Sequence, residues 1–85
     1  MLWVIKVDEL VYKQLSRFPD HDGKRILSVI KSFSENPFAG DIVKIKGERD
    51  IWRRRAGNYR VFFEVYPDSR FISVFNVERR TSKTY

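Results

Sequence analysis

Four arginines and two large aromatic residues are concentrated in residues 52–60 of the chain, which read Trp52-Arg53-Arg54-Arg55-Ala56-Gly57-Asn58-Tyr59-Arg60. A guanidinium group binds phosphate through paired hydrogen bonds, and aromatic rings stack on unpaired bases. This stretch is therefore a candidate surface for RNA. A solvated basic sheet face that only keeps the protein soluble is the alternative interpretation of the same residues.

The net charge of the chain comes entirely from its second half. Residues 1–43 balance six basic against six acidic residues, whereas residues 44–85 carry eleven basic and five acidic residues, and the total is +6. A sequence pI near 9.9 indicates an acidic partner, which could be nucleic acid, an anionic surface or an acidic protein.

Several classes of site are disfavoured by composition. The chain has no cysteine, and its one histidine, His21, has no second histidine beside it, so we expect no metal and no cofactor. No apolar run approaches the roughly 20 residues that a membrane span needs, and the apolar N-terminus is too short for a signal peptide. We expect a cytoplasmic protein that forms a single domain over residues 1–85.

The pattern of apolar residues predicts the order β-α-α-β-β-β. Strands are expected at residues 2–7, 51–56, 59–66 and 70–77, with a further short strand possible at residues 42–45. Asp8 is a candidate cap for a first helix, and Pro19 to Gly23 is expected to form a loop before a second helix at about residues 22–35. These elements predict an α/β (α+β) fold, in which two N-terminal helices pack on one face of a twisted, mainly antiparallel sheet and the first strand pairs with the later meander.

Strand alternation predicts which arginines share a face. In the strand at residues 59–66, Val61, Phe63 and Val65 form the natural core face, so Arg60 should point away from the helices. A register that also turns Arg53 and Arg55 outward would build one cationic patch. Arg54 lies on the opposite face, where its stem could cover apolar surface or its charge could pair with a helix carboxylate.

Taken together, these residues resemble the RelE branch of the RelE/ParE toxin superfamily, the small basic toxins of bacterial and archaeal toxin–antitoxin pairs. The resemblance spans essentially the whole chain. It includes the first strand, the helical hairpin, the exit Asn36-Pro37-Phe38, the stretch at residues 52–61, and Val77-Glu78-Arg79-Arg80 before a terminal Tyr85.

The resemblance implies a toxin that cuts messenger RNA in the ribosomal A site without a metal. In such toxins the ribose 2′-hydroxyl attacks the adjacent phosphate and leaves a 2′,3′-cyclic phosphate, which requires a base, an acid and cations to hold the extra charge. The implied partners are the ribosome with its message, and a cognate acidic antitoxin whose C-terminal segment wraps the toxin.

The site residues implied by the resemblance fall into two groups. Those implied as catalytic are Arg60, Arg79 and Tyr85, and those implied to bind phosphate or RNA are Arg53, Arg55 and Arg80. The best-known RelE toxins have lysine where this chain has Arg53 and Arg55. Because arginine stays protonated, these two residues can bind phosphate but are poor bases. Tyr85 and Glu78 remain as candidates for proton transfer.

Two other functions are compatible with the same resemblance. One is a non-nuclease inhibitor like the ParE branch, which poisons DNA gyrase. The other is a degenerate toxin that still binds an antitoxin but does little chemistry. The arginine set together with Tyr85 favours the nuclease.

Overall fold

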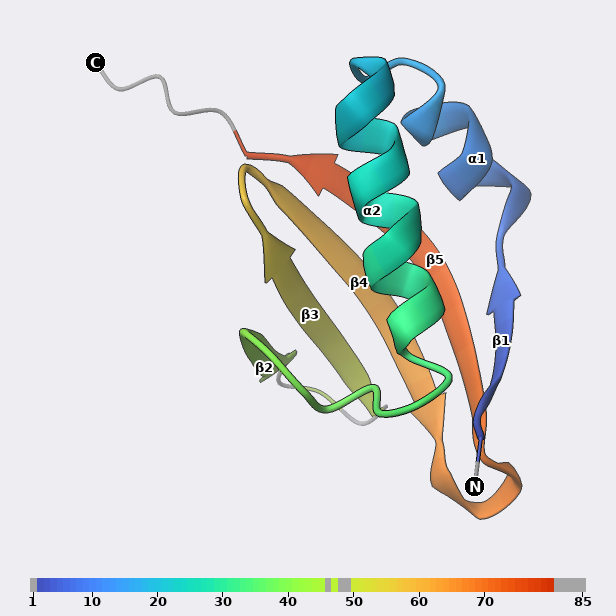
Figure 1. The fold of residues 1–85 in the computed structure, drawn as a ribbon. Coiled ribbons are helices and arrows are strands. Elements are labelled where there is room, and N and C mark those ends of the chain that lie inside the picture. The colour runs from blue at the N-terminus through green and yellow to red at the C-terminus, as the bar shows by residue number, and fades with distance from the viewer. Residues whose placement is uncertain (1, 46, 48–49, 81–85) are drawn as a thin grey trace.

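The computed structural model describes residues 2–45, 47 and 50–80, and within this part five strands form one sheet covered on one face by two helices (Figure 1). The strands are β1 (Val4–Val7), β2 (Ile42–Ile45), β3 (Ile51–Ala56), β4 (Tyr59–Tyr66) and β5 (Phe71–Arg79). The helices are α1 (Glu9–Leu15) and α2 (Asp20–Ser32), and a 3-10 turn, Pro67–Ser69, joins β4 to β5.

The strands are arranged in the order β1-β5-β4-β3-β2. β1 pairs with β5 in parallel, and the other three pairs are antiparallel. The first strand thus joins the far side of the later meander, as the sequence predicted. The predicted fold class is confirmed, and the short strand at Ile42–Ile45 is present at the opposite edge of the sheet.

Each helix starts at a residue with a clear local reason. The Asp8 side chain accepts a hydrogen bond of 2.9 Å from the Leu10 backbone N–H, which satisfies one of the free donors at the start of α1. Pro19 precedes α2, whose first turn contains Asp20 and Asp22. Carboxylates are favourable there because they face the positive end of the helix dipole.

The core lies between the two helices and the central strands β4 and β5. The rings of Phe33 and Phe63 pack with their centroids 4.5 Å apart. The fully buried side chains from the helical layer and from the sheet are Val11, Ile26, Ile30, Phe33, Val61, Phe63, Ile72 and Val74. Within the part of the chain that the structure describes, no helix lies on the other face of the sheet (Figure 1).

The boundaries of several elements differ from the expectation. Residues 20–23 form the first turn of α2 rather than a loop, because Pro19 can precede a helix without losing a hydrogen bond. α2 ends at Ser32 rather than near residue 35, and β5 continues to Arg79 rather than stopping at Val77. None of the helices in the described residues has the length and apolar character of a membrane span.

Candidate active site

The hairpin of β3 and β4 brings three of the predicted arginines together. Gly57, with φ of +61°, allows the tight turn that joins the two strands. Arg55 then pairs with Arg60, and Arg53 pairs with Phe62, so these side chains share one sheet face. Val61 and Phe63, which alternate with them, are fully buried on the helix side. The structure therefore places Arg53, Arg55 and Arg60 on the face that no helix covers, as alternation predicted.

A row of four charged residues crosses this open face at the end of the sheet near the β3–β4 turn. The row runs from Asp41, next to β2, through Arg55 and Arg60 to Glu78 on β5. Arg55 Nε lies 3.9 Å from Asp41 Oδ2. The row therefore holds two adjacent guanidinium groups, one from β3 and one from β4, with a carboxylate at each end.

One guanidinium nitrogen in each of Arg53 and Arg60 has no protein acceptor. The Nε atom of each is buried and has no hydrogen-bond partner among the described residues. An unpaired buried donor is unfavourable by about 1–3 kcal/mol unless an acceptor is supplied. A bound anion on the open face would supply such acceptors to these side chains.

Two phenylalanines lie beside the arginines. Phe62 occupies the same face as Arg60, and its ring centroid is 6.5 Å from that of Phe75 on β5. Both rings are partly exposed. The position of Phe62, two residues after Arg60 in the same strand, is the sequence signal for the open face. Partly exposed rings next to cations can stack on bases.

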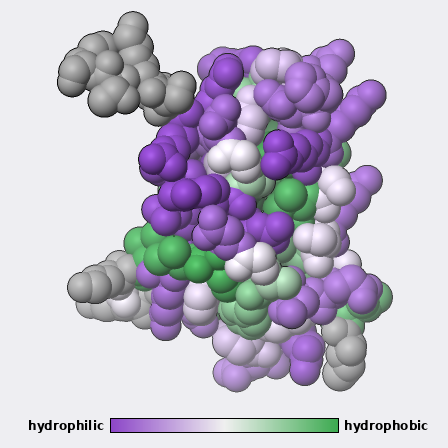
Figure 2. Space-filling view, turned by 60° about the vertical axis from the view of Figure 1, so that its left-hand side comes forward, coloured by the Kyte–Doolittle hydropathy of each residue, from purple (hydrophilic) through white to green (hydrophobic). Residues whose placement is uncertain are grey.

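The charge and hydropathy of the surface change along the sheet. Figure 2 shows hydrophilic side chains gathered over the end of the molecule that carries the β3–β4 turn, with a hydrophobic band at the level of β2. Val43, which pairs with Arg53, is 45% exposed. The arginine site thus borders an apolar surface.

Arg54 has a structural contact on the helix side. Its Nη1 donates a hydrogen bond of 3.2 Å to the carbonyl oxygen of Ala39. The guanidinium also lies against Gly40, so close that a Cβ atom there would be 2.6 Å from Arg54 Cζ. Arg54 therefore holds the loop before β2 in place. The sequence suggested a pairing of Arg54 with a helix carboxylate, and the structure shows this contact with the loop instead.

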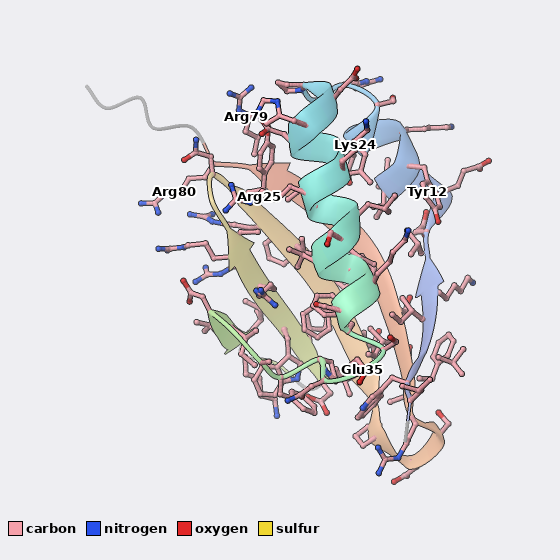
Figure 3. All side chains as sticks on the ribbon, viewed as in Figure 1. Tyr12, Lys24, Arg25, Glu35, Arg79 and Arg80 are labelled. Atoms are coloured by element: carbon pink, nitrogen blue, oxygen red, sulfur yellow. The ribbon has the colours of Figure 1, made fainter. Side chains whose placement is uncertain are left out.

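The structure does not bring Arg79 together with Arg60. Arg79 pairs with Tyr59 across β4 and β5, and its guanidinium lies 5.9 Å from the centre of the Tyr59 ring. Because Tyr59 points into the core, Arg79 lies on the helix side of the sheet, near the start of α2 (Figure 3). Arg80 follows β5, its backbone N–H bonds to the Asn58 carbonyl, and its side chain points away from the helices (Figure 3).

Tyr59 anchors this end of the sheet to α2. Its hydroxyl donates a hydrogen bond of 2.7 Å to Asp22 Oδ2, and the Phe18 ring packs 4.6 Å from its own. Burial raises the pKa of Tyr59, the Asp22 hydrogen bond and charge raise it further, and the Arg79 charge opposes them. Tyr59 therefore stays protonated as a hydrogen-bond donor.

Two remaining expectations concern Tyr85 and metal binding. Tyr85 lies outside the described residues. Among the residues that the structure describes, no three side chains of the kinds His, Asp or Glu are grouped closely enough to hold a metal ion.

The fold agrees with that of known proteins. The family model of the ParE toxin of the type II toxin–antitoxin system parDE matches residues 6–83. The chain therefore belongs to the RelE/ParE superfamily of type II toxin–antitoxin toxins.

Individual relatives are of the RelE kind. The toxin RelE3 of Methanocaldococcus jannaschii is 43% identical over 61 residues, which is 67% of this chain and 69% of the relative. The archaeal RelE–RelB complex from Pyrococcus horikoshii OT3 contains a chain with a TM-score of 0.85 and 25% identity, with 98% of this chain and 100% of that chain covered. The RelB–RelE antitoxin–toxin complex from Methanococcus jannaschii has a TM-score of 0.69 and 32% identity, with 86% and 87% covered.

Proposed function

We propose that this toxin is a ribosome-dependent endoribonuclease that cuts messenger RNA in the A site and so inhibits translation in the cytoplasm. The observation that supports the proposal most is the cluster of Arg53, Arg55 and Arg60 on one open sheet face beside partly exposed aromatic rings. The reaction is attack of the 2′-hydroxyl on the adjacent phosphate, and it proceeds without a catalytic metal.

The arginines would act on the charge of the reacting phosphate. The phosphate gains negative charge as the 2′-oxygen attacks, and preorganised donors lower the energy of that state more than that of the ground state. Arg60 lies at the centre of the charged row and is the first candidate for this role, with Arg55 directly opposite it. Arg53 and Arg80 would bind neighbouring phosphates.

Arg79 would need a movement to take part. To act as the catalytic residue that the resemblance implies, Arg79 would have to move its guanidinium off the Tyr59 ring and around the end of β5 to the open face. A bound RNA would favour that movement only if the phosphate contact exceeds the cation–π contact, which is about 0.5–1 kcal/mol at exposed sites.

An antitoxin is the proposed protein partner. The relatives from Pyrococcus horikoshii and Methanococcus jannaschii were crystallised as RelE–RelB complexes. A net charge of +6 favours an acidic partner, and we propose an antitoxin whose C-terminal segment wraps this domain.

A gyrase inhibitor is the second candidate, because the family model that matches the chain carries the ParE name. A toxin of that kind would arrest DNA replication and leave ribosome-bound message intact. A toxin that has kept only antitoxin binding would do neither.

The test is cleavage of ribosome-bound message by the purified chain. Wild type should give a 2′,3′-cyclic phosphate and a 5′-hydroxyl, and a 2′-deoxy nucleotide at the cleavage position should block the reaction. Arg60→Ala should lower the single-turnover rate by roughly 10²–10³, since that is the usual effect of losing one oxyanion donor. Arg17→Ala removes an equal charge from an exposed position in the turn after α1 and should leave the rate unchanged. Intact message together with inhibited gyrase would support the ParE-like function instead.

A further inference from the structure

The pairing of β4 with β5 contains an irregularity that decides which residue faces Arg60. Phe63 pairs with Val74, but Phe62 pairs with Asn76, so Phe75 is an extra residue on β5. If the register of the Phe63–Val74 pair continued, Arg60 would face Val77. The bulge shifts the pairing by one residue and puts Glu78 directly opposite Arg60. Bulges near active sites commonly redirect a side chain in this way.

A chain of three hydrogen bonds connects α1 to the Glu78 carboxylate. The backbone N–H of Val77 donates to Gln14 Oε1 at 2.8 Å, and Gln14 Nε2 donates to Asn76 Oδ1 at 2.7 Å. Asn76 Nδ2 in turn donates to Glu78 Oε2 at 3.4 Å. Because a backbone N–H can only donate, the first bond fixes the orientation of both amides.

Gln14 can make these contacts because β1 no longer covers this part of β5. The parallel pairing of β1 ends at Val7 and Val74, and no other strand of the described residues pairs with the edge of β5 beyond that point. The Gln14 amide takes the place of a strand there. The helical layer is thereby connected, through Asn76, to a carboxylate beside Arg60.

The other carboxylates of this face are placed differently. Asp41 lies at the far end of the row, next to Arg55. Glu64 is only 8% exposed, and other interactions engage it. Glu78 is exposed and faces Arg60, and side chains directly opposite on an antiparallel pair have Cβ atoms about 4.5–5.5 Å apart.

We propose that Glu78 is the general base of the cleavage reaction, an inference that rests on the nuclease function proposed above. The Glu78 carboxylate takes the proton of the ribose 2′-hydroxyl as the 2′-oxygen forms its bond to phosphorus. The bond from phosphorus to the 5′-oxygen breaks, and that oxygen leaves with the electron pair and takes a proton from water. Arg60 holds the phosphate next to the base throughout.

This assignment accounts for the presence of Arg53 and Arg55 at positions where the best-known RelE toxins have lysine. Arginine remains protonated, so Arg53 and Arg55 can neutralise phosphate charge but cannot accept the proton. A carboxylate is a competent proton acceptor when it is within hydrogen-bond reach of the hydroxyl. The bulge and the Gln14–Asn76 contacts give this chain such a carboxylate at the required place.

The first experiment compares Glu78→Gln with Glu35→Gln in single-turnover cleavage of ribosome-bound message. Glu78→Gln keeps the size of the side chain and removes the base, so its rate should fall by about 10²–10⁴ while ribosome binding is retained. Glu35 lies at the opposite end of α2 from Arg79 and Arg80 (Figure 3), and its variant should cleave at the wild-type rate. Thermal unfolding checks that both variants fold.

The second experiment separates proton transfer from a structural role. Formate should restore cleavage by Glu78→Ala in a concentration-dependent manner, and it should not restore cleavage by Arg60→Ala. Wild-type rates in Glu78→Gln, or a slow Glu78→Ala that formate does not accelerate, would overturn the assignment and leave the nuclease function standing. Absence of cleavage by the wild-type chain would overturn both.

Discussion

Arg55 and Arg60 lie directly opposite each other in the antiparallel pair of β3 and β4, on the sheet face that no helix covers. Like charges in this position destabilise a sheet, since their Cβ atoms are only about 4.5–5.5 Å apart. Asp41 offsets part of the repulsion from the side of Arg55, and Glu78, opposite Arg60 on β5, offsets part of it from the other side. The remaining repulsion is a local conflict of the kind that proteins tolerate at functional sites, and a bound phosphate would relieve it.

The first prediction is that removing the charge of Arg60 stabilises the folded protein while it removes the proposed activity. Arg60→Met, made in a Glu78→Gln background so that the carboxylate opposite Arg60 does not enter the comparison, keeps the aliphatic stem and eliminates both the repulsion and the buried unpaired Nε. The free energy of unfolding should rise by about 0.2–1 kcal/mol at low salt, measured by urea denaturation. High salt should reduce the difference, because it screens the repulsion. Arg17→Met should change neither quantity, and a destabilised Arg60→Met would contradict the prediction.

The second prediction concerns the buried hydroxyl of Tyr59. Tyr59→Phe removes its hydrogen bond to Asp22 and should lower the free energy of unfolding near pH 7 by about 0.5–1.5 kcal/mol. Tyr12→Phe, which changes a tyrosine that is 52% exposed, should have little effect.

The difference between wild type and Tyr59→Phe should also depend on pH in a definite direction. Burial raises the pKa of Tyr59 in the folded state above its ordinary value near 10. Above about pH 10 the unfolded chain releases the phenolic proton while the folded chain keeps it, so the free energy of unfolding of wild type falls. The advantage of wild type should therefore be complete below pH 10 and shrink above it. Urea unfolding at a series of pH values would measure it, and a constant difference would argue against the raised pKa.

The third prediction concerns the contact between Gly40 and Arg54. Gly40 has φ of +89°, and a methyl group there would collide with the Arg54 guanidinium. Gly40→Ala should lower the free energy of unfolding by about 1–3 kcal/mol through strain and the displaced side chain. The loss should be smaller in an Arg54→Ala background, where only the strain of the backbone remains. Equal losses in the two backgrounds would mean that Arg54 moves aside freely.

The sequence by itself determined the fold class and the strands that carry the arginines. β3 and β4 occupy the predicted residues. The side-chain period of two was enough to place Arg60 on the face of the sheet away from Val61 and Phe63. The start of α2 was misplaced because a Pro-Asp-His-Asp-Gly segment is typical of a loop. In this chain its proline instead precedes a helix whose first turn is acidic.

The tertiary structure alone decided which groups meet at the site. Alternation within one strand does not specify the register of the partner strand. The extra residue Phe75 in β5 shifts that register, so that Glu78 lies opposite Arg60 and Arg79 lies opposite Tyr59, with its guanidinium over the Tyr59 ring. The Gln14–Asn76 contact joins residues 62 positions apart in the chain. Such contacts arise from how strands and helices pack in three dimensions, and no local pattern of residue types encodes them.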